Sequence, residues 1–165
     1  MQPGRVFRHL LLPRWLIRRA FPMAALDRIV AAVKASVARH DAELRVCIEG
    51  GLDLLELLAG QSARARAADV FGLLRVWDTA HNSGVLIYLQ LADRRVEILA
   101  DRGISRAVPE ATWRQICAGI EQACANGRHA EGVLEAVERI TVLLEQHCPA
   151  RESNPNELPN RPRVL

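Results

Sequence analysis

Residues 75–104 read "RVWDTAHNSGVLIYLQLADRRVEILADRGI", and this stretch decides the fold. A loop leads into two apolar strands, and the turn Ala92-Asp93-Arg94 between them is short enough to force an antiparallel hairpin. Residues 84–92 form a nearly continuous apolar run, which is typical of a central strand covered on both faces. The turn also places residues near 84 and 101 opposite each other across the hairpin.

The segments around this hairpin predict one more strand and several helices. Residues 43–50, "ELRVCIEG", alternate apolar and polar side chains, which predicts a half-buried strand closed by Gly50-Gly51. Helices separate this strand from the strand at 84–92, so the two are expected to be parallel with a right-handed crossover. Helical periodicity or capping signals predict helices at 5–20 (with a break at Pro13), 24–42, 52–60, 63–77, 108–127 and 130–148.

The expected order of elements is therefore α-α-β-α-α-β-β-α-α. This order predicts the α/β class: an α/β/α sandwich with a small mixed sheet, two parallel strands plus an antiparallel hairpin strand, and helices on both faces. The chain of 165 residues is long enough for one such domain, expected at residues 24–148. The Pro-rich tail at 149–165 has no period and is expected to be extended or mobile. Because it retains Leu158, Val164 and Leu165, we expect it to pack on the domain or on a partner.

Positive charge is concentrated in residues 1–22, which form a basic amphipathic N-terminal arm. This segment holds five arginines and no acid, so a net charge of +3 for the whole chain leaves about −2 (+3 minus +5) for the rest. Such an arm favours contact with an anionic membrane surface or partner. The body carries no basic stripe, so nucleic acid is not an expected partner. The residues expected to make this contact are Arg5, Arg8, Arg14, Trp15, Arg18 and Arg19.

Cysteine spacing and the N-terminal sequence bear on localisation. Cys47, Cys117, Cys124 and Cys148 lack zinc-ligand spacing and are interpreted as reduced core residues, which fits a reducing compartment. The apolar run "LLLPRWLI" is interrupted by Pro13 and Arg14, unlike a signal peptide or a membrane span. We therefore expect a cytoplasmic protein, peripheral at the inner membrane face.

No motif identifies catalytic residues, but two groups of polar residues are candidate sites. Asp78, Asn82 and Asp101 flank the hairpin strands, and oxygen ligands there could hold calcium or magnesium. Alternatively, they cap turns, and Asp101 pairs with an arginine. The second candidate is Glu49 with Asp93, at the carboxyl edge where open α/β sheets tend to bind ligands. Its alternative is an exposed Glu49 and an Asp93 that is only a turn residue.

The stretch "NSGVLIYLQLADRRVEILADRGI" resembles the central signature of the TPM domain family, the thylakoid-lumen phosphatase-like proteins and their bacterial relatives. "AELRVCIEG" and "GQSARARAADVFGLLRVWDT" resemble the family's first strand and the helix before the signature, and the resemblance covers roughly residues 24–148. It implies an α/β/α sandwich, acid phosphatase activity, calcium binding in some members and roles in membrane-complex maintenance. This chain has Asn82, Ala92 and Ser105 where the family pattern has carboxylates.

The resemblance is strongest to a short bacterial branch without a signal peptide, whose members look like companions of LemA-type membrane proteins. We therefore expect a non-enzymatic TPM-like adaptor at the cytoplasmic membrane face, with an anionic membrane surface or a LemA-type membrane protein as partner. No cofactor is required for this role. The alternative is a weak acid phosphatase dependent on a divalent metal, calcium or magnesium.

Overall fold

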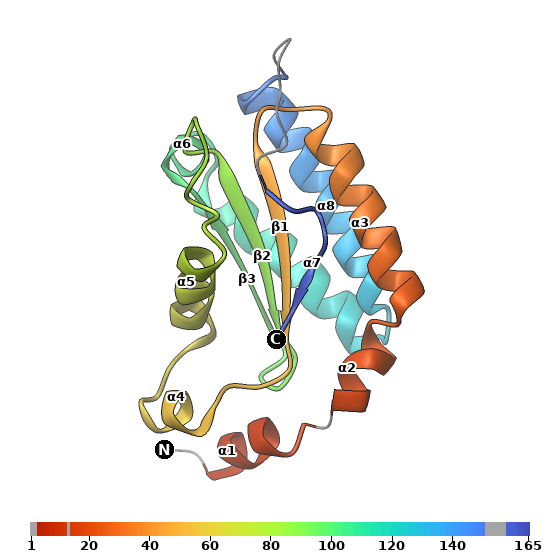
Figure 1. The fold of residues 1–165 in the computed structure, drawn as a ribbon, viewed down its shortest axis with the longest axis vertical. Helices are drawn as coiled ribbons and strands as arrows, with labels where there is room; N and C mark the ends of the chain where they lie inside the picture. The colour runs from red at the N-terminus through yellow and green to blue at the C-terminus, as the bar shows by residue number, and fades with distance from the viewer. Residues whose placement is uncertain (1–2, 13, 151–157) are drawn as a thin grey trace.

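A four-stranded sheet in the order β3-β2-β1-β4 forms the middle layer of the protein (Figure 1). This computed structural model describes residues 3–12, 14–150 and 158–165. The strands are β1 (Glu43–Glu49), β2 (Gly84–Gln90), β3 (Arg95–Ala100) and β4 (Arg163–Val164). β1 runs parallel to β2 and β4, whereas β2 and β3 form the antiparallel hairpin. The predicted fold class is confirmed.

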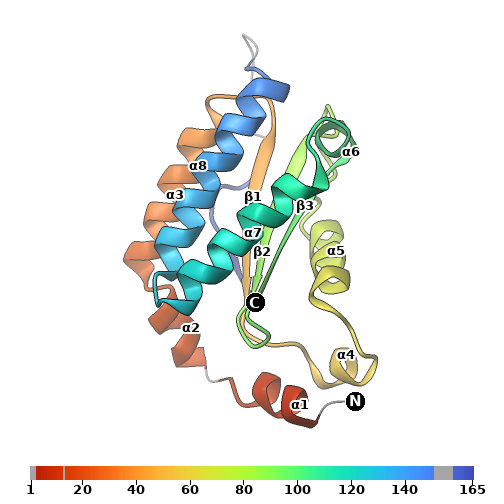
Figure 2. The ribbon, with the colours of Figure 1, turned by 180° about the vertical axis from the view of Figure 1, so that it is seen from behind.

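Helices cover both faces of this sheet (Figures 1 and 2). On one face lie α3 (Met23–Val37), α7 (Glu110–Ala125) and α8 (His129–His147). Val46 of β1 and Ile87 of β2 pack with them in the larger hydrophobic core. On the other face lies α5 (Ala63–Leu73), and Leu86 and Tyr88 of β2 belong to a smaller core with its side chains. Alternate residues of the strands thus enter two separate cores.

The N-terminal arm forms two helices, α1 (Pro3–Leu10) and α2 (Arg14–Ala20), on either side of residue 13. α1 lies beside the short helix α4 (Leu54–Leu58), at the end of the sheet where β1 and β2 terminate (Figure 1). At the opposite end, the short helix α6 (Arg102–Ser105) follows β3. The arm therefore crosses the carboxyl edge of the parallel strands, while the segment from β3 to α7 turns at the other edge.

The hairpin has the register that the short turn predicts. Val85 pairs with Ala100, and the Asp101 N–H donates to the Gly84 carbonyl at 2.8 Å. Gly84 is required for close backbone approach, because a Cβ built on it would lie 1.8 Å from the Val76 carbonyl oxygen. The loop before β2 is thereby packed directly against the start of the strand.

The polar side of β1 is covered by α5 and by the tail, and this corrects the expected half-buried strand. β1 is buried along its whole length, not half-buried. Of its polar positions, Arg45 donates to the Pro159 carbonyl of the tail, Cys47 packs in the smaller core with Leu158 and side chains of α5, and Glu49 is bound by Arg66 of α5. The end of the tail also pairs with the edge of β1, where the Leu165 N–H donates to the Ile48 carbonyl at 2.9 Å. The described part of the tail thus packs on the domain as expected, but it also adds a strand that the sequence did not predict.

The buried central strand should dominate stability. Leu86 is fully buried in the smaller core, so Leu86→Ala should lower the free energy of unfolding by about 2–5 kcal/mol, through lost burial and a cavity. Leu55→Ala is the matched control, because Leu55 on α4 is 79% exposed. Urea unfolding monitored by circular dichroism measures both; equal losses in the two variants would contradict this assignment of the core.

Candidate functional site

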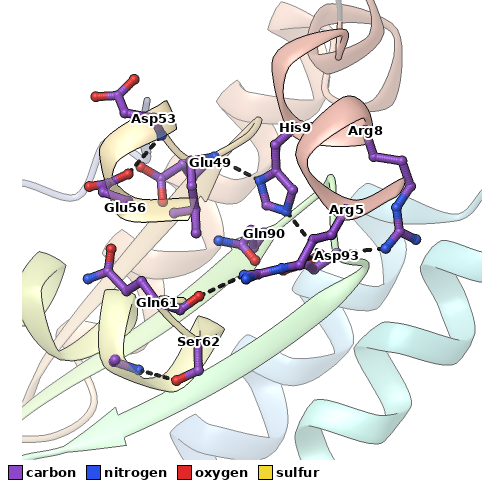
Figure 3. Close-up of polar contacts among 12 residues, drawn as sticks. Arg5, Arg8, His9, Glu49, Asp53, Glu56, Gln61, Ser62, Gln90 and Asp93 are labelled. Carbon is purple, nitrogen blue, oxygen red and sulfur yellow. Dashed lines mark hydrogen bonds and ion pairs between the residues drawn. The ribbon is translucent and has the colours of Figure 1, made fainter. Parts of the chain in front are cut away.

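The carboxyl edge of the sheet carries a dense cluster of charged and polar side chains (Figure 3). β1 ends at Glu49, which pairs with Gln90 at the end of β2, and Asp93 follows in the turn of the hairpin. Helices α1, α4 and α5 contribute the residues that meet these groups (Figure 3). The structure therefore places Glu49 and Asp93 at one edge, but each is bound by different partners.

Glu49 is buried at 3% exposure and is bound by a cation of the same chain. Arg66 of α5 donates through Nη2 to Oε1 at 2.6 Å and through Nε to Oε2 at 3.0 Å. The Tyr88 hydroxyl donates to Oε2, and Arg66 also reaches Glu56 of α4 at 2.6 Å. A buried carboxylate needs such partners, because isolated charge is strongly disfavoured away from water. The alternative interpretation of Glu49 as an exposed residue is therefore wrong.

The pKa values of the groups around Glu49 follow from this geometry. The hydrogen bond to Glu49 is the main cause that raises the pKa of the Arg66 guanidinium above its ordinary value. Burial, and then the hydrogen bond to Glu49, raise the pKa of the Tyr88 hydroxyl. Arg66 is thus held charged and Tyr88 protonated, so both act as donors to Glu49.

Asp93 is held by the N-terminal arm. Arg5 donates through Nη2 to Oδ2 at 2.8 Å and through Nε to the same oxygen at 3.0 Å, and Nη2 also reaches the Gln61 carbonyl at 2.7 Å. His9 Nε2 lies 2.9 Å from Oδ1, and Arg8 lies at 3.9 Å. Partial burial alone would raise the pKa of Asp93, but the contacts with Arg5 and His9 outweigh it and hold that pKa below its ordinary value.

His9 links the arm to the chain just after β1. It is almost fully buried, and its Nδ1 accepts the Leu52 N–H at 2.9 Å. A neutral ring that accepts at Nδ1 carries its proton on Nε2, which faces Asp93. The arm comes so close here that a Cβ on Gly51 would lie 2.7 Å from the His9 carbonyl oxygen. Gly51 therefore permits the docking of α1.

Gln90 completes the cluster at the end of β2. It is 1% exposed, and its amide nitrogen donates to the Tyr88 hydroxyl at 3.2 Å. Its Oε1 is buried and accepts no hydrogen bond from the residues that the structure describes. Both acidic groups at this edge are matched by arginine or histidine of the same chain, so the arrangement works as a closed ionic cluster.

The other candidate residues lie at the opposite end of the sheet. Asp78 and Asn82 are exposed, and the Asn82 carbonyl accepts the Gly103 N–H at 2.9 Å, so the two loops do meet there. Asp101 is 9% exposed and caps α6, with Oδ1 accepting the Arg102 N–H at 2.6 Å. Within residues 3–12, 14–150 and 158–165, no three His, Cys, Asp or Glu side chains are placed to hold a metal ion. Calcium or magnesium binding by this set stays a prediction.

The expected contact residues of the arm divide into two groups. Arg5 faces inward to Asp93 and Arg8 lies at its edge, whereas Trp15, Arg18 and Arg19 are exposed. The side chain of Arg14 lies outside the described residues. Two of the five side chains described in this set, those of Arg5 and Arg8, are thus used within the molecule.

A serine–histidine pair also occurs, but in the core. Ser36 Oγ lies 2.9 Å from His40 Nε2 and accepts from Thr141 at 2.6 Å, and all three side chains are buried between α3 and α8. Burial is the main cause that lowers the pKa of His40. A nucleophile closed off from solvent in this way cannot meet a substrate without local unfolding. We therefore interpret the pair as internal hydrogen bonding between two helices.

Sequence reasoning identified Glu49 and Asp93 but missed their partners. Arg66, Tyr88 and Gln90 lie in ordinary helix and strand patterns, and His9 is one of several polar residues on a basic helix. The Gly50-Gly51 pair after a strand is the one signal that could have indicated close approach of another segment. Nothing in the local sequence indicates which segment that is.

Together, the mixed sheet, the two helical layers and the arm bound at the hairpin tip define a small α/β/α sandwich protein with a closed carboxyl edge. The sequence model of the TPM domain family matches residues 20–143. The chain therefore belongs to the TPM domain family. A comparison with curated proteins gave no match.

Solved structures agree with this assignment. The NMR structure of the BA42 protein from the psychrophilic bacterium Bizionia argentinensis is similar, with a TM-score of 0.75 and 25% identity, covering 86% of this chain and 93% of that one. The N-terminal domain of a protein from P. gingivalis has a TM-score of 0.56 and 21% identity, covering 79% and 82%. The second similarity shows the fold alone.

Removing the cation beside Glu49 should be strongly destabilising. Arg66→Gln leaves a carboxylate that is 3% exposed without its charged partner, so the free energy of unfolding should fall by about 3–5 kcal/mol. Arg39→Gln is the control, because Arg39 also bridges two glutamates but at the surface. Thermal and urea unfolding compare the variants; a loss no larger than that of the control would contradict the buried cluster.

Loss of the Asp93 contacts should release the arm. Asp93→Asn and Gly51→Ala should both increase tryptic cleavage in residues 5–19, the first by removing the charge and the second by a backbone clash. Because the pKa of Asp93 is lowered, its contribution is complete at neutral pH and is lost only as the pH falls below about 4, the usual aspartate range. Gly72→Ala is the control, because a Cβ there meets nothing. Unchanged cleavage in both variants would contradict docking.

Proposed function

We propose that this TPM-domain protein is a non-catalytic adaptor that binds an anionic membrane surface through the end formed by α1, α2 and α4. One observation carries the proposal: large apolar side chains of the arm and of α4 are exposed at the same end. We call this set the apolar end, and its members are Phe7, Leu10, Leu11, Trp15, Leu54, Leu55 and Leu58. Phe7 is 68% exposed and Leu55 is 79% exposed, which is unusual for such side chains when they cluster.

The docked arm creates this surface from two distant segments. α1 contacts α4, and the ion pair with Asp93 fixes α1 against the carboxyl edge (Figure 3). Without the ion pair to Asp93, α1 would not be held in one position relative to α4, and the apolar residues of the two helices would not form one surface. The closed ionic cluster therefore supports a role in presenting a surface.

The charges around the apolar end fit an anionic surface. Arg18 and Arg19 of α2 are exposed, and the side chain of Arg8 on α1 is more than half exposed. Each arginine near an anionic bilayer contributes roughly 1 kcal/mol of attraction, and apolar side chains add burial at the headgroup boundary. No helix of the described chain is long and apolar enough to cross a membrane. The mode of binding that we propose is peripheral, at the cytoplasmic face of the inner membrane, which is the location that the sequence led us to expect.

The proposed partner at the membrane is a membrane protein of the LemA type, the class that the resemblance of the sequence suggests. The LemA-type protein would contact a TPM domain that the apolar end has already oriented on the membrane. Greater sedimentation with vesicles that contain a LemA-type protein than with plain vesicles of the same lipids tests this step. Equal sedimentation with both vesicles would exclude it.

A weak acid phosphatase at the opposite end is the second candidate, and one observation favours it. Asp101 Oδ2 is buried and accepts no hydrogen bond from the described residues, so it could take a cation. Asp78 and Asn82 are exposed and do not complete a ligand set around it here. Release of phosphate from an aryl phosphate, with calcium, magnesium or chelator, distinguishes the candidates. Turnover that is lost in Asp101→Asn would favour the phosphatase.

Vesicle sedimentation tests the adaptor. The full chain should bind vesicles rich in phosphatidylglycerol, bind neutral phosphatidylcholine vesicles weakly, and lose affinity with added salt. Phe7→Ser with Leu55→Ser should weaken binding about tenfold or more, since each removes apolar burial. Leu73→Ser is the control, because Leu73 is equally exposed on α5. Equally weak binding by the full chain and a chain lacking residues 1–22 would contradict the proposal.

A further inference from the structure

We propose that a cavity beside the β2–β3 hairpin binds a phosphate-bearing amphiphile, an anionic phosphate head with a short apolar chain. The cavity has a volume of about 510 Å³, which lies within the range of small-molecule sites in proteins. Its lining residues come from three parts of the fold: α2, the hairpin, and the end of α7 with the turn to α8. Figure 2 shows where these elements lie in the fold. Of the residues in the cluster at the carboxyl edge, Gln90 also lines this cavity, whereas Glu49, Asp93 and their arginine partners do not.

The cavity combines an apolar wall with cations. Leu89 and Val96 are buried side chains of the two hairpin strands, and Leu16 and Leu91 add further apolar surface. Because Leu89 and Val96 are buried, the apolar wall lies on the inner side of the cavity. Such a wall is suited to an alkyl chain and is poorly suited to a small hydrated anion alone.

Three arginines line the same cavity from two separate segments. Arg19 comes from α2, and Arg94 and Arg95 come from the hairpin. All three residues are exposed, so their charges lie toward the opening. Guanidinium groups bind phosphate oxygens with paired hydrogen bonds, and three of them match a head with several anionic oxygens better than a single carboxylate.

The other titratable groups in the cavity leave this positive charge largely intact. Glu121 is the one acid among the lining residues; it accepts the Val96 N–H at 3.1 Å and lies 3.9 Å from Arg95. Burial raises the pKa of the Cys124 thiol to about 11, so this thiol is neutral at physiological pH. The arginines and the glutamate of the lining together carry a formal charge of +2 (three arginines minus one glutamate).

The cavity adjoins the apolar end and shares α2 with it, because Arg19 lines the cavity and Trp15 belongs to the apolar end. Its remaining residues, on the hairpin and at the α7–α8 turn, are not part of α1 or α4, and a soluble ligand can reach them without a bilayer. The phosphate-bearing amphiphile could be a lipid or a soluble phosphate ester, since both present the same chemistry. The site and the proposed membrane binding can therefore succeed or fail separately.

Titration of the full-length protein with octyl phosphate, below the concentration at which it forms micelles, tests the site. We expect saturable amide chemical-shift changes at Leu91, Val96 and Gly127, which line the cavity. Inorganic phosphate should bind at least about tenfold more weakly than octyl phosphate, because it lacks the alkyl chain. Octyl glucoside should also bind at least about tenfold more weakly than octyl phosphate, because it lacks the negative charge. A soluble phosphorylated sugar and a short-chain phosphatidylglycerol in further titrations distinguish a soluble ester from a lipid as the source.

Arg94→Gly provides a variant that should fold. Arg94 has a φ of +54°, a left-handed conformation that glycine adopts without strain, so this substitution removes the charge without disturbing the turn. It should weaken octyl phosphate binding about tenfold. Arg75→Gly is the matched control, because Arg75 is an exposed arginine with a φ of +52° outside the cavity. Equal affinity in wild type and Arg94→Gly, or equal binding of octyl phosphate, inorganic phosphate and octyl glucoside, would overturn the proposal.

Discussion

The contact between Asp93 and the N-terminal arm is the interaction on which the arrangement of the carboxyl edge depends. Asp93 lies at the tip of the hairpin, and Arg5 and His9 reach it across 88 and 84 residues of sequence. Each partner has a second anchor, Arg5 on the Gln61 carbonyl and His9 on the Leu52 N–H. Because these anchors lie on different segments, one carboxylate fixes α1 against both the hairpin and the chain after β1. The same contact closes the carboxyl edge and orients the apolar residues of the arm.

The second carboxylate of this edge has a different role. Glu49 is buried between the sheet and α5, where the desolvation of an ion pair offsets much of the attraction within it. Its contribution is therefore to fix the position of α5 and of the Tyr88 hydroxyl, with little net gain in stability. Removing one partner is far more damaging than the pair is stabilising. Glu49 and Asp93, two acids at the carboxyl edge of the sheet, are both neutralised by arginines of the same chain. This neutralisation suits a surface that makes its contacts through other side chains.

The sequence predicted the architecture because its strongest patterns are local. The short turn after Leu91 determined the antiparallel pairing of β2 and β3, and the helices between β1 and β2 required a parallel crossover. β4 was missed because two residues paired at the end of an irregular, Pro-rich tail have no detectable period. The alternation in β1 indicated a half-buried strand, since the sequence does not show that α5 and residues 158–165 cover its polar side.

The candidate site was predicted only in part, for the same reason. Topology alone brings Glu49 and Asp93 to one edge, so their position could be inferred from the order of elements. Their partners could not, because the choice between Arg5 and the other arginines of the arm depends on packing of α1 against Gly51. The sequence indicates a basic amphipathic arm whose arginines face an outside partner, whereas Arg5 is an internal partner of Asp93, and several large apolar side chains of the arm are exposed.

In the proposed function, the docked arm and α4 meet a membrane together, as one surface. Paramagnetic broadening of amide signals by anionic nanodiscs with a gadolinium-chelating lipid measures which residues approach the bilayer. The account predicts joint broadening at Phe7 of α1 and Leu55 of α4, and none at Ile104 of α6, at the opposite end of the sheet. Broadening of Phe7 without Leu55 would mean that the arm leaves the domain to bind lipid, and broadening at Ile104 would mean that the wrong end faces the membrane; either result would contradict the account.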